Sequence, residues 1–151
     1  MAREIHIAKT PLVLRLALAI RDGQLQNQQS MMSRGRSFSF SKSRRLTRTS
    51  EYKRVKRDGV VRRGKLLTLS AAVVENSGLC RIGFVTSRRL GSAVVRNRVR
   101  RRLREIVRQH QHELEQDFWI VLIAKRDAAN ASYSALEDEW LRLARRASIL
   151  L

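Results

Sequence analysis

The sequence predicts an α+β fold, a two-layer sandwich in which helices pack on one small sheet. Residues 118–124 are an unbroken apolar run, which is typical of a strand buried on both faces. The segments 66–74 and 79–87 are rich in β-branched and apolar residues and are separated by turn residues. Segments with helical periodicity lie before and after them. The expected order is therefore helix, two or three strands, helix, strand and helix.

The first expected helix begins at Thr49 or Ser50, which are both capping residues, and ends near Gly59. Its spacing turns Tyr52 and Val55 inward or toward a cleft. Spacing alone favours a core position for Tyr52, because most aromatic side chains at such positions are buried.

The segment 59–66 is close to a phosphate-binding loop but departs from it twice. Leu66 stands where a serine or threonine would bind magnesium. The segment also leads from a helix into a strand, so no helix N-terminus would face a phosphate. We therefore interpret its two glycines as the end of a helix and the start of a strand.

The segments 66–74 and 79–87 are predicted to pair as an antiparallel hairpin across a turn at 75–78. Gly83 lies in the middle of the second segment and indicates a bulge or a close backbone approach. Cys80 is the single cysteine, which excludes an internal disulfide and suits a reducing compartment. We expect it to be a buried structural thiol.

A long basic helix is predicted from about Ala93 to about Leu114, with Ser92 as its cap. One apolar stripe along it is formed by Val95, Val99, Leu103, Ile106 and His110. Residues 88–104 contain eight arginines and no acid, and 26 of the 32 basic residues in the chain are arginines. Like charges along a helix repel one another, and the arginine fork binds phosphate in bidentate fashion. This pattern indicates a helix that binds a polyanion.

The strand at 118–124 is expected to place Trp119 in the core, and residues 125–127 follow it as an exposed end. A last helix is predicted to begin at a capping box formed by Ser134 and Glu137. Its apolar stripe consists of Leu136, Trp140, Leu143 and Ala147.

The charge of the chain is strongly asymmetric. The net charge is +19; residues 1–104 carry 26 basic against 5 acidic residues, a balance of +21, and residues 105–151 carry 6 against 8, a balance of −2. Such a distribution indicates a nucleic-acid-binding protein whose binding surface lies in the first part of the chain. A membrane protein is not indicated, because the apolar stretch at 11–20 is short and is interrupted by Arg15.

The segments 83–89, Gly-Phe-Val-Thr-Ser-Arg-Arg, and 91–105, Gly-Ser-Ala-Val-Val-Arg-Asn-Arg-Val-Arg-Arg-Arg-Leu-Arg-Glu, resemble the signature of the bacterial ribonuclease P protein family. Its hallmark is Arg-Asn-Arg, here residues 96–98, followed by a basic helix that ends in Arg-Glu. The resemblance extends from about Arg45 to the C-terminus. It implies a ribosomal-protein-S5-like sandwich and an RNA-binding domain at 45–151.

The resemblance implies two RNA-binding surfaces. The catalytic RNA would contact Arg88, Arg89, Arg96, Asn97, Arg98, Arg100, Arg101, Arg102 and Arg104. The single-stranded 5′ leader of precursor tRNA would lie in a cleft near Tyr52, Lys56, Ser70 and Thr86. Lys56 departs from the family, which often has a second aromatic there, so leader binding is expected to depend more on charge than on stacking.

The resemblance further implies a subunit of ribonuclease P, whose RNA subunit cleaves precursor tRNA with magnesium ions held mainly by that RNA. The protein itself is expected to have no catalytic residue, no metal site, no small-molecule cofactor and no membrane contact, and to work in the cytoplasm. Its partners would be ribonuclease P RNA and precursor tRNA.

The residues agree with a protein that lacks its own active site. The acids of the basic part of the chain show no spacing that converges on one site, as a two-metal nuclease requires. They are Glu51, Asp58, Glu75 and, at its boundary, Glu105. His110 and His112 would lie about 200° apart on a helix and cannot bind one ion together. Two alternatives are a ribosomal-protein-like or chaperone-like RNA-binding protein, and a metal-dependent nuclease that acts alone.

Residues 1–44 do not resemble the family. We consider a misassigned start with the true initiator at Met31 or Met32, a disordered basic arm, and a targeting peptide, and we favour the first. Phe38 and Phe40 lie among basic residues and could stack on RNA bases, but a core or disordered position is the preferred interpretation.

Overall fold

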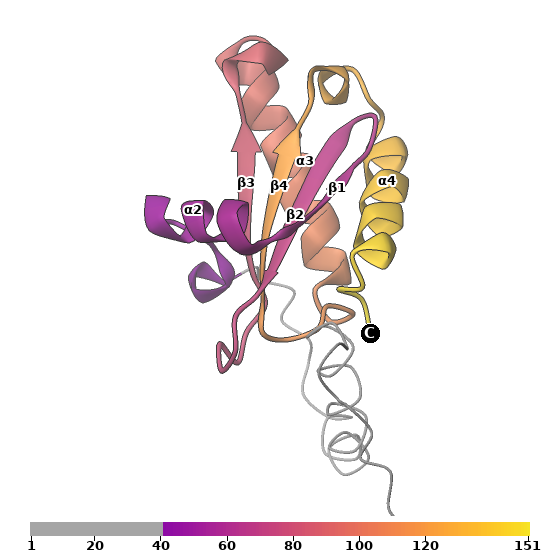
Figure 1. Ribbon diagram of the computed structural model, residues 1–151. Helices are drawn as coiled ribbons and strands as arrows, with labels where there is room; N and C mark the ends of the chain where they lie inside the picture. The colour runs from indigo at the N-terminus through magenta and orange to yellow at the C-terminus, as the bar shows by residue number, and fades with distance from the viewer. Residues whose placement is uncertain (1–40) are drawn as a thin grey trace, which may run out of the picture. The chain divides into compact units, whose positions relative to one another are not determined.

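Figure 1 shows a computed structural model that describes residues 41–151. Its strands are β1 (Val60–Arg63), β2 (Leu67–Val73), β3 (Arg81–Thr86) and β4 (Phe118–Ala124). Its helices are α2 (Thr49–Asp58), α3 (Ala93–His110) and α4 (Tyr133–Arg146), with short 3-10 helices η1 (Lys42–Arg44), η2 (Arg88–Leu90) and η3 (Arg126–Ala129). The α+β class and the order of elements are confirmed. Three strands precede the basic helix, and β1 is the additional one. The predictions on Met31, Met32 and the two phenylalanines lie outside the described residues.

The predicted hairpin between residues 66–74 and 79–87 is wrong. The sheet order is β1-β2-β4-β3, so β4 lies between the two segments, antiparallel to β2 and parallel to β3. A strand whose side chains are apolar on both faces gains most from a central position. The parallel pair β3 and β4 is connected through α3, as parallel strands require a long crossover. The hairpin that does form is β1 with β2.

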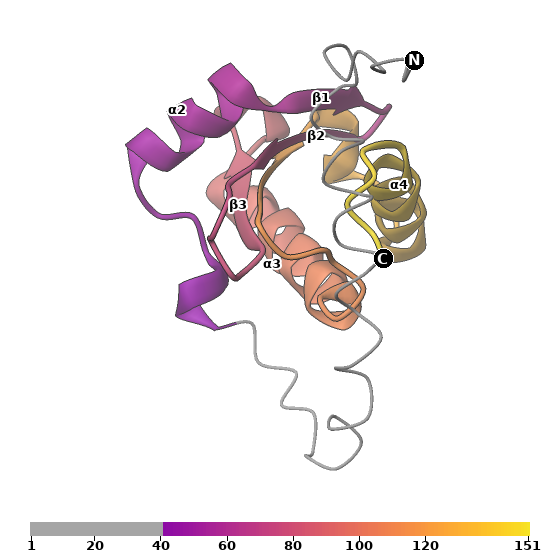
Figure 2. The same cartoon turned by 60° about the horizontal axis from the view of Figure 1, so that its bottom comes forward.

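The main core lies between the sheet and helices α3 and α4, which cover the same face in Figure 2. Leu69, Ile82 and Ile120 of the sheet are fully buried there. Leu136, Trp140 and Leu143 of the α4 stripe are also fully buried, as predicted. Within residues 41–151, none of the helices has the length and apolar character needed to cross a membrane.

Helix α2 covers part of the opposite face of the sheet (Figure 2). Val55 is completely buried against Ala72 and Val121. Trp119 was expected in the core but is only half-buried. The guanidinium groups of Arg54 and Arg81 each lie over its ring, 5.3 Å from the ring centroid. Cation–π contacts on this scale stabilise a partly exposed indole ring.

The start of α2 is stabilised by Glu51 and not by a Thr49 or Ser50 cap. The Glu51 carboxylate accepts the backbone N–H groups of Thr47 at 2.8 Å and Arg48 at 2.9 Å. It also binds the Arg81 guanidinium at 2.6 Å. Burial raises the pKa of Glu51, but these hydrogen bonds and the arginine outweigh burial and lower the pKa below its ordinary value.

Helix α4 begins two residues earlier than the predicted capping box. Ser132 is the cap, and its hydroxyl accepts the N–H of Ala135 at 3.1 Å. Two neighbouring acids of α4 differ in burial: Asp138 is exposed, whereas Glu139 is only 6% exposed.

Glu139 fills the turn between β1 and β2, the segment that is close to a phosphate-binding loop. Its carboxylate accepts three consecutive backbone N–H groups, from Lys65 at 2.8 Å and from Leu66 and Leu67 at 2.6 Å each. A Cβ atom on Gly64 would lie 2.6 Å from the Glu139 carboxyl carbon. The backbone donors that would bind a phosphate therefore bind a carboxylate of the same chain.

Replacing Glu139 with glutamine is expected to lower the free energy of unfolding by about 1.5–3 kcal/mol. The glutamine amide has one oxygen that accepts hydrogen bonds more weakly than a carboxylate. Its NH₂ group is a donor and cannot bind the backbone N–H groups of the turn. Urea denaturation measures the change, with Asp138→Asn on the exposed side of the helix as the matched control. An unfolding midpoint that is the same for both variants would contradict this role of Glu139.

Candidate RNA interface

Helix α3 is anchored to the sheet from behind. Ser92 caps it as predicted, with its hydroxyl accepting the N–H of Val95 at 3.4 Å. Val99, Leu103 and Ile106 of the predicted stripe are completely buried. The helix ends at His110 and not near Leu114, because the chain turns there to enter β4. This anchoring fixes the direction in which the arginines of α3 extend.

Two arginines of α3 contact the loop that leads into α4. Arg98 Nη2 donates to the Ala129 carbonyl at 3.3 Å, and Arg102 Nη1 donates to the Ala131 carbonyl at 2.9 Å. The two residues are one helical turn apart, so they form one row along the helix. A guanidinium has five N–H donors, and a single carbonyl bond holds it in place while others remain for an anion.

The other arginines of α3 and η2 extend in different directions. Arg96 donates to the Gly91 carbonyl at 2.9 Å, near the start of the helix. Arg100 donates to the Thr86 hydroxyl at the end of β3. The exposed residues of the predicted set are Arg88, Arg89, Asn97, Arg98, Arg101 and Arg104. The structure thus places all nine predicted catalytic-RNA contacts on η2 and α3, but not all on one face.

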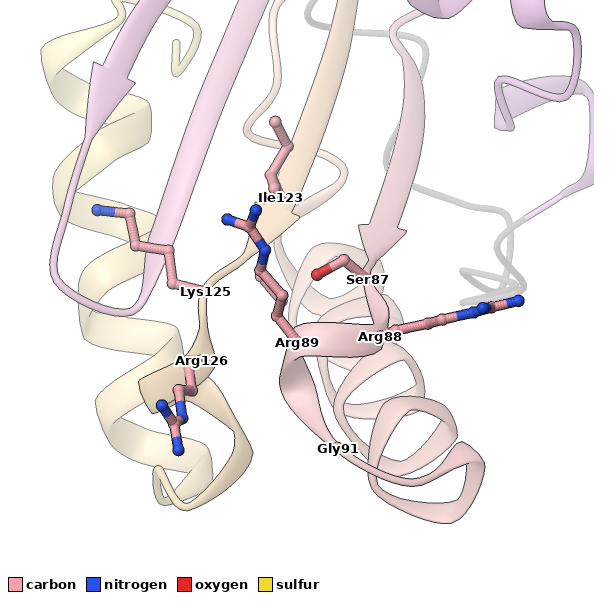
Figure 3. A pocket seen from close by; sticks show the side chains of 8 residues that line it. Ser87, Arg88, Arg89, Gly91, Ile123, Lys125 and Arg126 are labelled. Atoms are coloured by element: carbon pink, nitrogen blue, oxygen red, sulfur yellow. The ribbon is translucent and has the colours of Figure 1, made fainter.

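A cavity of about 610 Å³ lies where β3 and β4 end. It is lined by Ser87, Arg88, Arg89, Gly91, Ile123, Ala124, Lys125 and Arg126, so four of its residues are basic and none is acidic. Figure 3 shows Arg89 extending toward Ile123, whereas Arg88 extends away from it. Lys125 Nζ donates to the Gly64 carbonyl at 2.6 Å, which ties this edge to the β1–β2 turn.

The cavity continues an open part of the sheet surface. Thr68, Ile123 and Val85 are register partners on neighbouring strands, on the face that α2 covers elsewhere. Ile123 is 37% exposed, whereas Val121, under α2, is 6% exposed. The open surface therefore has Ile123 and Val85 on its floor and basic residues at the end where β3 and β4 stop.

A second cavity, of about 320 Å³, lies at the outer edge of β3 between α2 and α3. It is lined by Arg45, Leu46, Thr47, Tyr52, Ile82, Gly83, Phe84, Arg100 and Arg104. The Tyr52 hydroxyl donates to the Leu46 carbonyl at 3.1 Å, which fixes the ring. Burial raises the pKa of Tyr52, and the neighbouring Glu51 carboxylate raises it further. A Cβ atom on Gly83 would lie 2.6 Å from the Tyr52 ring, so the predicted close approach at Gly83 is confirmed.

The predicted leader residues are only partly brought together. Tyr52 lines the second cavity, and Thr86 lies at the end of β3 beside Arg100. Lys56 is exposed one turn after Tyr52 and lines neither cavity. Ser70 is buried, and its hydroxyl donates to the Val55 carbonyl at 3.3 Å. The prediction of Ser70 as a surface contact is wrong, because α2 covers it.

His110 contacts two carboxylates and joins two helices. His110 Nδ1 lies 3.0 Å from Glu113 Oε1 and Nε2 lies 2.9 Å from Glu137 Oε1, joining α3 to α4. Burial lowers the pKa of His110, but hydrogen bonds to the two carboxylates outweigh burial and raise the pKa above its ordinary value. Across residues 41–151 no three or more His, Cys, Asp and Glu side chains are grouped so that they could hold a metal ion. Cys80 is buried, which raises the pKa of its thiol to about 12.

Comparisons with known proteins agree with this arrangement. The family model for ribonuclease P matches residues 40–148. A ribonuclease P protein component from Syntrophomonas wolfei is 32% identical over 111 residues, which are 73% of this chain and 92% of the relative. One from Roseiflexus sp. is 40% identical over 107 residues, 70% of this chain and 87% of the relative. The chain belongs to the bacterial ribonuclease P protein family.

Solved structures of ribonuclease P proteins share this fold. The protein from Staphylococcus aureus has a TM-score of 0.67 at 19% identity, covering 72% of this chain and 98% of that one. The protein from Thermotoga maritima has a TM-score of 0.62 at 22% identity, covering 68% and 96%. Family membership makes this chain the protein component of ribonuclease P, a nuclease of tRNA processing. It is an RNA-binding protein.

Several cavity residues of this ribonuclease P protein were missed from the sequence. The sequence predicts only an exposed strand end at Lys125 and Arg126, and it indicates no role for Arg45 or Phe84. The position of Lys125 and Arg126 directly after a strand is a partial signal, because parallel strands end at the same edge of a sheet. Using it required knowing that β3 pairs with β4, which periodicity does not reveal.

The substitution Gly83→Ala is expected to lower the free energy of unfolding by about 1–3 kcal/mol, because the added methyl group overlaps the Tyr52 ring. In a Tyr52→Ala background the same substitution should cost much less, since the ring is absent. A double-mutant cycle from denaturation curves measures the coupling between the two positions. Equal costs in both backgrounds would mean that the ring does not pack on Gly83.

Proposed function

We propose that this chain is the protein subunit of a ribonuclease P in which the RNA subunit cleaves precursor tRNA. Helix α3 and η2 bind the catalytic RNA, and the open sheet surface with the cavity at the ends of β3 and β4 binds the 5′ leader. The observation that carries this proposal is the pairing of two neighbouring surfaces. One is the arginine helix, whose basic run at residues 88–104 has no acid and which is anchored by a buried stripe; the other is an open surface with an apolar floor and basic residues where β3 and β4 end.

The outer side of α3 suits a folded RNA. Its arginines lie in rows one helical turn apart, and bonds to carbonyls such as those of Ala129 and Ala131 orient two of them. Oriented guanidinium groups bind phosphate oxygens in bidentate fashion with less loss of side-chain entropy. Binding should therefore weaken steeply with salt, as expected when several phosphates release counterions.

The open sheet surface suits a single strand. Unpaired nucleotides can lay bases on an apolar floor such as Ile123 and Val85 while phosphates face the basic residues at its border. The one aromatic residue of the predicted leader cleft, Tyr52, lies in the neighbouring cavity. The basic residues at the border of this surface support a larger part for charge than for stacking in leader binding.

Three acids of residues 41–151 are held in structural contacts, which supports a non-catalytic protein. Glu51 binds Arg81, Glu139 binds the β1–β2 turn, and Glu105 binds Arg108. We assign the magnesium ions of the reaction to the RNA subunit, as the resemblance implies; within residues 41–151 no three or more His, Cys, Asp and Glu side chains are grouped so that they could hold one. The precursor tRNA and the catalytic RNA are the two partners, and the cytoplasm is the proposed site of action.

The test is cleavage of a precursor tRNA with a 5′ leader at low magnesium concentration, with the protein alone, a bacterial ribonuclease P RNA alone, and both together. Leader removal only in the mixture is expected.

Replacing Arg96 and Arg98 together with alanine should weaken assembly with the RNA about a hundredfold while thermal stability changes little, since each side chain is held by a single hydrogen bond to a carbonyl.

The matched control replaces Arg145 and Arg146 of α4, which removes the same charge from a surface outside the proposed interface. Equal loss of RNA assembly in both double variants would mean that the RNA responds only to the net charge of the protein and not to the arginines of α3. Cleavage by the protein alone would overturn the non-catalytic role. RNA binding without stimulation of cleavage would instead favour a ribosomal-protein-like or chaperone-like RNA-binding protein.

A further inference from the structure

The turn between β1 and β2 connects a buried acid to a basic residue of the larger cavity. Glu139, on α4, is only 6% exposed and accepts backbone N–H groups of this turn. Lys125, directly after β4, lines the cavity at the ends of β3 and β4. The two residues belong to different elements, and both are bound to the same turn. The turn therefore joins the interior of the fold to the proposed leader surface.

Two peptide groups of the turn make this connection. The peptide group between residues 64 and 65 donates its N–H to Glu139 Oε1 at 2.8 Å, and its carbonyl accepts from Lys125 Nζ at 2.6 Å. The peptide group between residues 66 and 67 donates its N–H to Glu139 Oε2 at 2.6 Å, and its carbonyl accepts the backbone N–H of Lys125 at 2.8 Å. The N–H and C=O bonds of a trans peptide point in opposite directions, so each peptide group lies between Glu139 and Lys125.

This arrangement fixes Lys125 at both its backbone and its ammonium group. A carboxylate that binds the N–H of a peptide group polarises the group and makes its carbonyl a stronger acceptor for the ammonium. An ammonium group has three donors, so donors remain for an anion in the cavity. The negative charge of Glu139 is compensated by Arg142, whose Nη2 lies 2.9 Å from Oε1. The ammonium of Lys125 is thus oriented by a carbonyl and not paired with the carboxylate.

We propose that Glu139 is a positioning residue for RNA binding. Through the two peptide groups of the turn it holds the Lys125 ammonium where a leader phosphate meets the larger cavity. The proposal rests on the proposed function, because the phosphate belongs to the leader on the open sheet surface. It also gives Glu139 an effect opposite to its charge. General electrostatics predicts that removing a negative charge strengthens RNA binding, whereas loss of this carboxylate should weaken binding of the leader.

The experiment measures the leader gain of the assembled holoenzyme. This is the ratio of its affinity for a precursor tRNA with a non-cleavable linkage at the cleavage site to its affinity for mature tRNA. Lys125→Met should lower the leader gain about tenfold, the loss expected for one hydrogen bond to a charged group. Glu139→Gln keeps the Lys125 charge but releases its position, so it should lower the gain about threefold. In a Lys125→Met background, Glu139→Gln should cost nothing further, because the group that it positions is absent.

Two controls separate positioning from charge and from stability. Asp138→Asn removes the same charge from an exposed position of α4 and should not lower the leader gain. Leu143→Ala removes a fully buried side chain one turn later on the same helix, so it destabilises the fold without removing an acceptor from the turn. At a temperature where all variants are folded, Leu143→Ala should keep the wild-type leader gain.

A second measurement observes one of the two peptide groups directly. The dipeptide Gly-Lys occurs once in the sequence, at residues 64–65, so glycine labelled with ¹³C at the carbonyl and lysine labelled with ¹⁵N select this peptide group by NMR. Glu139→Gln should move the amide proton of Lys65 and the carbonyl carbon of Gly64 upfield, because the hydrogen bonds on both sides of the peptide group weaken. Asp138→Asn and Leu143→Ala should leave both resonances in place.

Three results would overturn the proposal. The first is an equal loss of leader gain in Glu139→Gln and Leu143→Ala. The second is a cost of Glu139→Gln that is the same with and without Lys125. The third is a Gly64 carbonyl resonance in Glu139→Gln that matches the wild type. A wild-type holoenzyme with no leader gain would instead show that the proposed function itself fails.

Discussion

Strand β4 has seven consecutive apolar side chains, which alternate between the two faces of the sheet, and most of them are removed from water. It therefore occupies the interior of the sheet, between β2 and β3. Helices α3 and α4 cover one face and α2 covers part of the other. Because α2 has only 10 residues, the end of β4 near Ile123 stays open, and this opening is the surface on which the proposed leader site depends.

The same constraint positions the charges. The parallel pairing of β3 with β4 requires a crossover, and that crossover is the arginine helix α3. Its buried stripe holds the helix against the sheet, so the arginines extend toward solvent, toward the loop before α4, and over the edge of β3. Both strands end at one edge, which brings Arg89 and Lys125 together in one cavity although they are far apart in the sequence. Acids such as Glu139 act inside the fold and leave these surfaces positive.

The elements could be predicted from the sequence because each has a local cause. Ser92 caps α3, Gly83 marks a close approach, and the apolar run at 118–124 marks the buried strand. The pairing of strands could not be predicted, since two strands with similar patterns look like a hairpin unless a third one is known to enter between them. The burial of Ser70 and the turn-binding role of Glu139 likewise depend on contacts with residues far along the chain, which local spacing does not contain.

The two proposed RNA-binding surfaces, one on α3 and one on the open sheet surface, are tested most directly by cleavage from single tethered probes. Cys80 is the only cysteine, and burial raises its pKa to about 12, so a thiol reagent should label only an introduced cysteine. Val94, on the first turn of α3, is 76% exposed, and Ile123 is on the open sheet surface. A hydroxyl-radical probe on Val94→Cys should cut the catalytic RNA, and one on Ile123→Cys should cut the 5′ leader. Cuts by both probes in the same RNA segment would contradict the separation of the two surfaces.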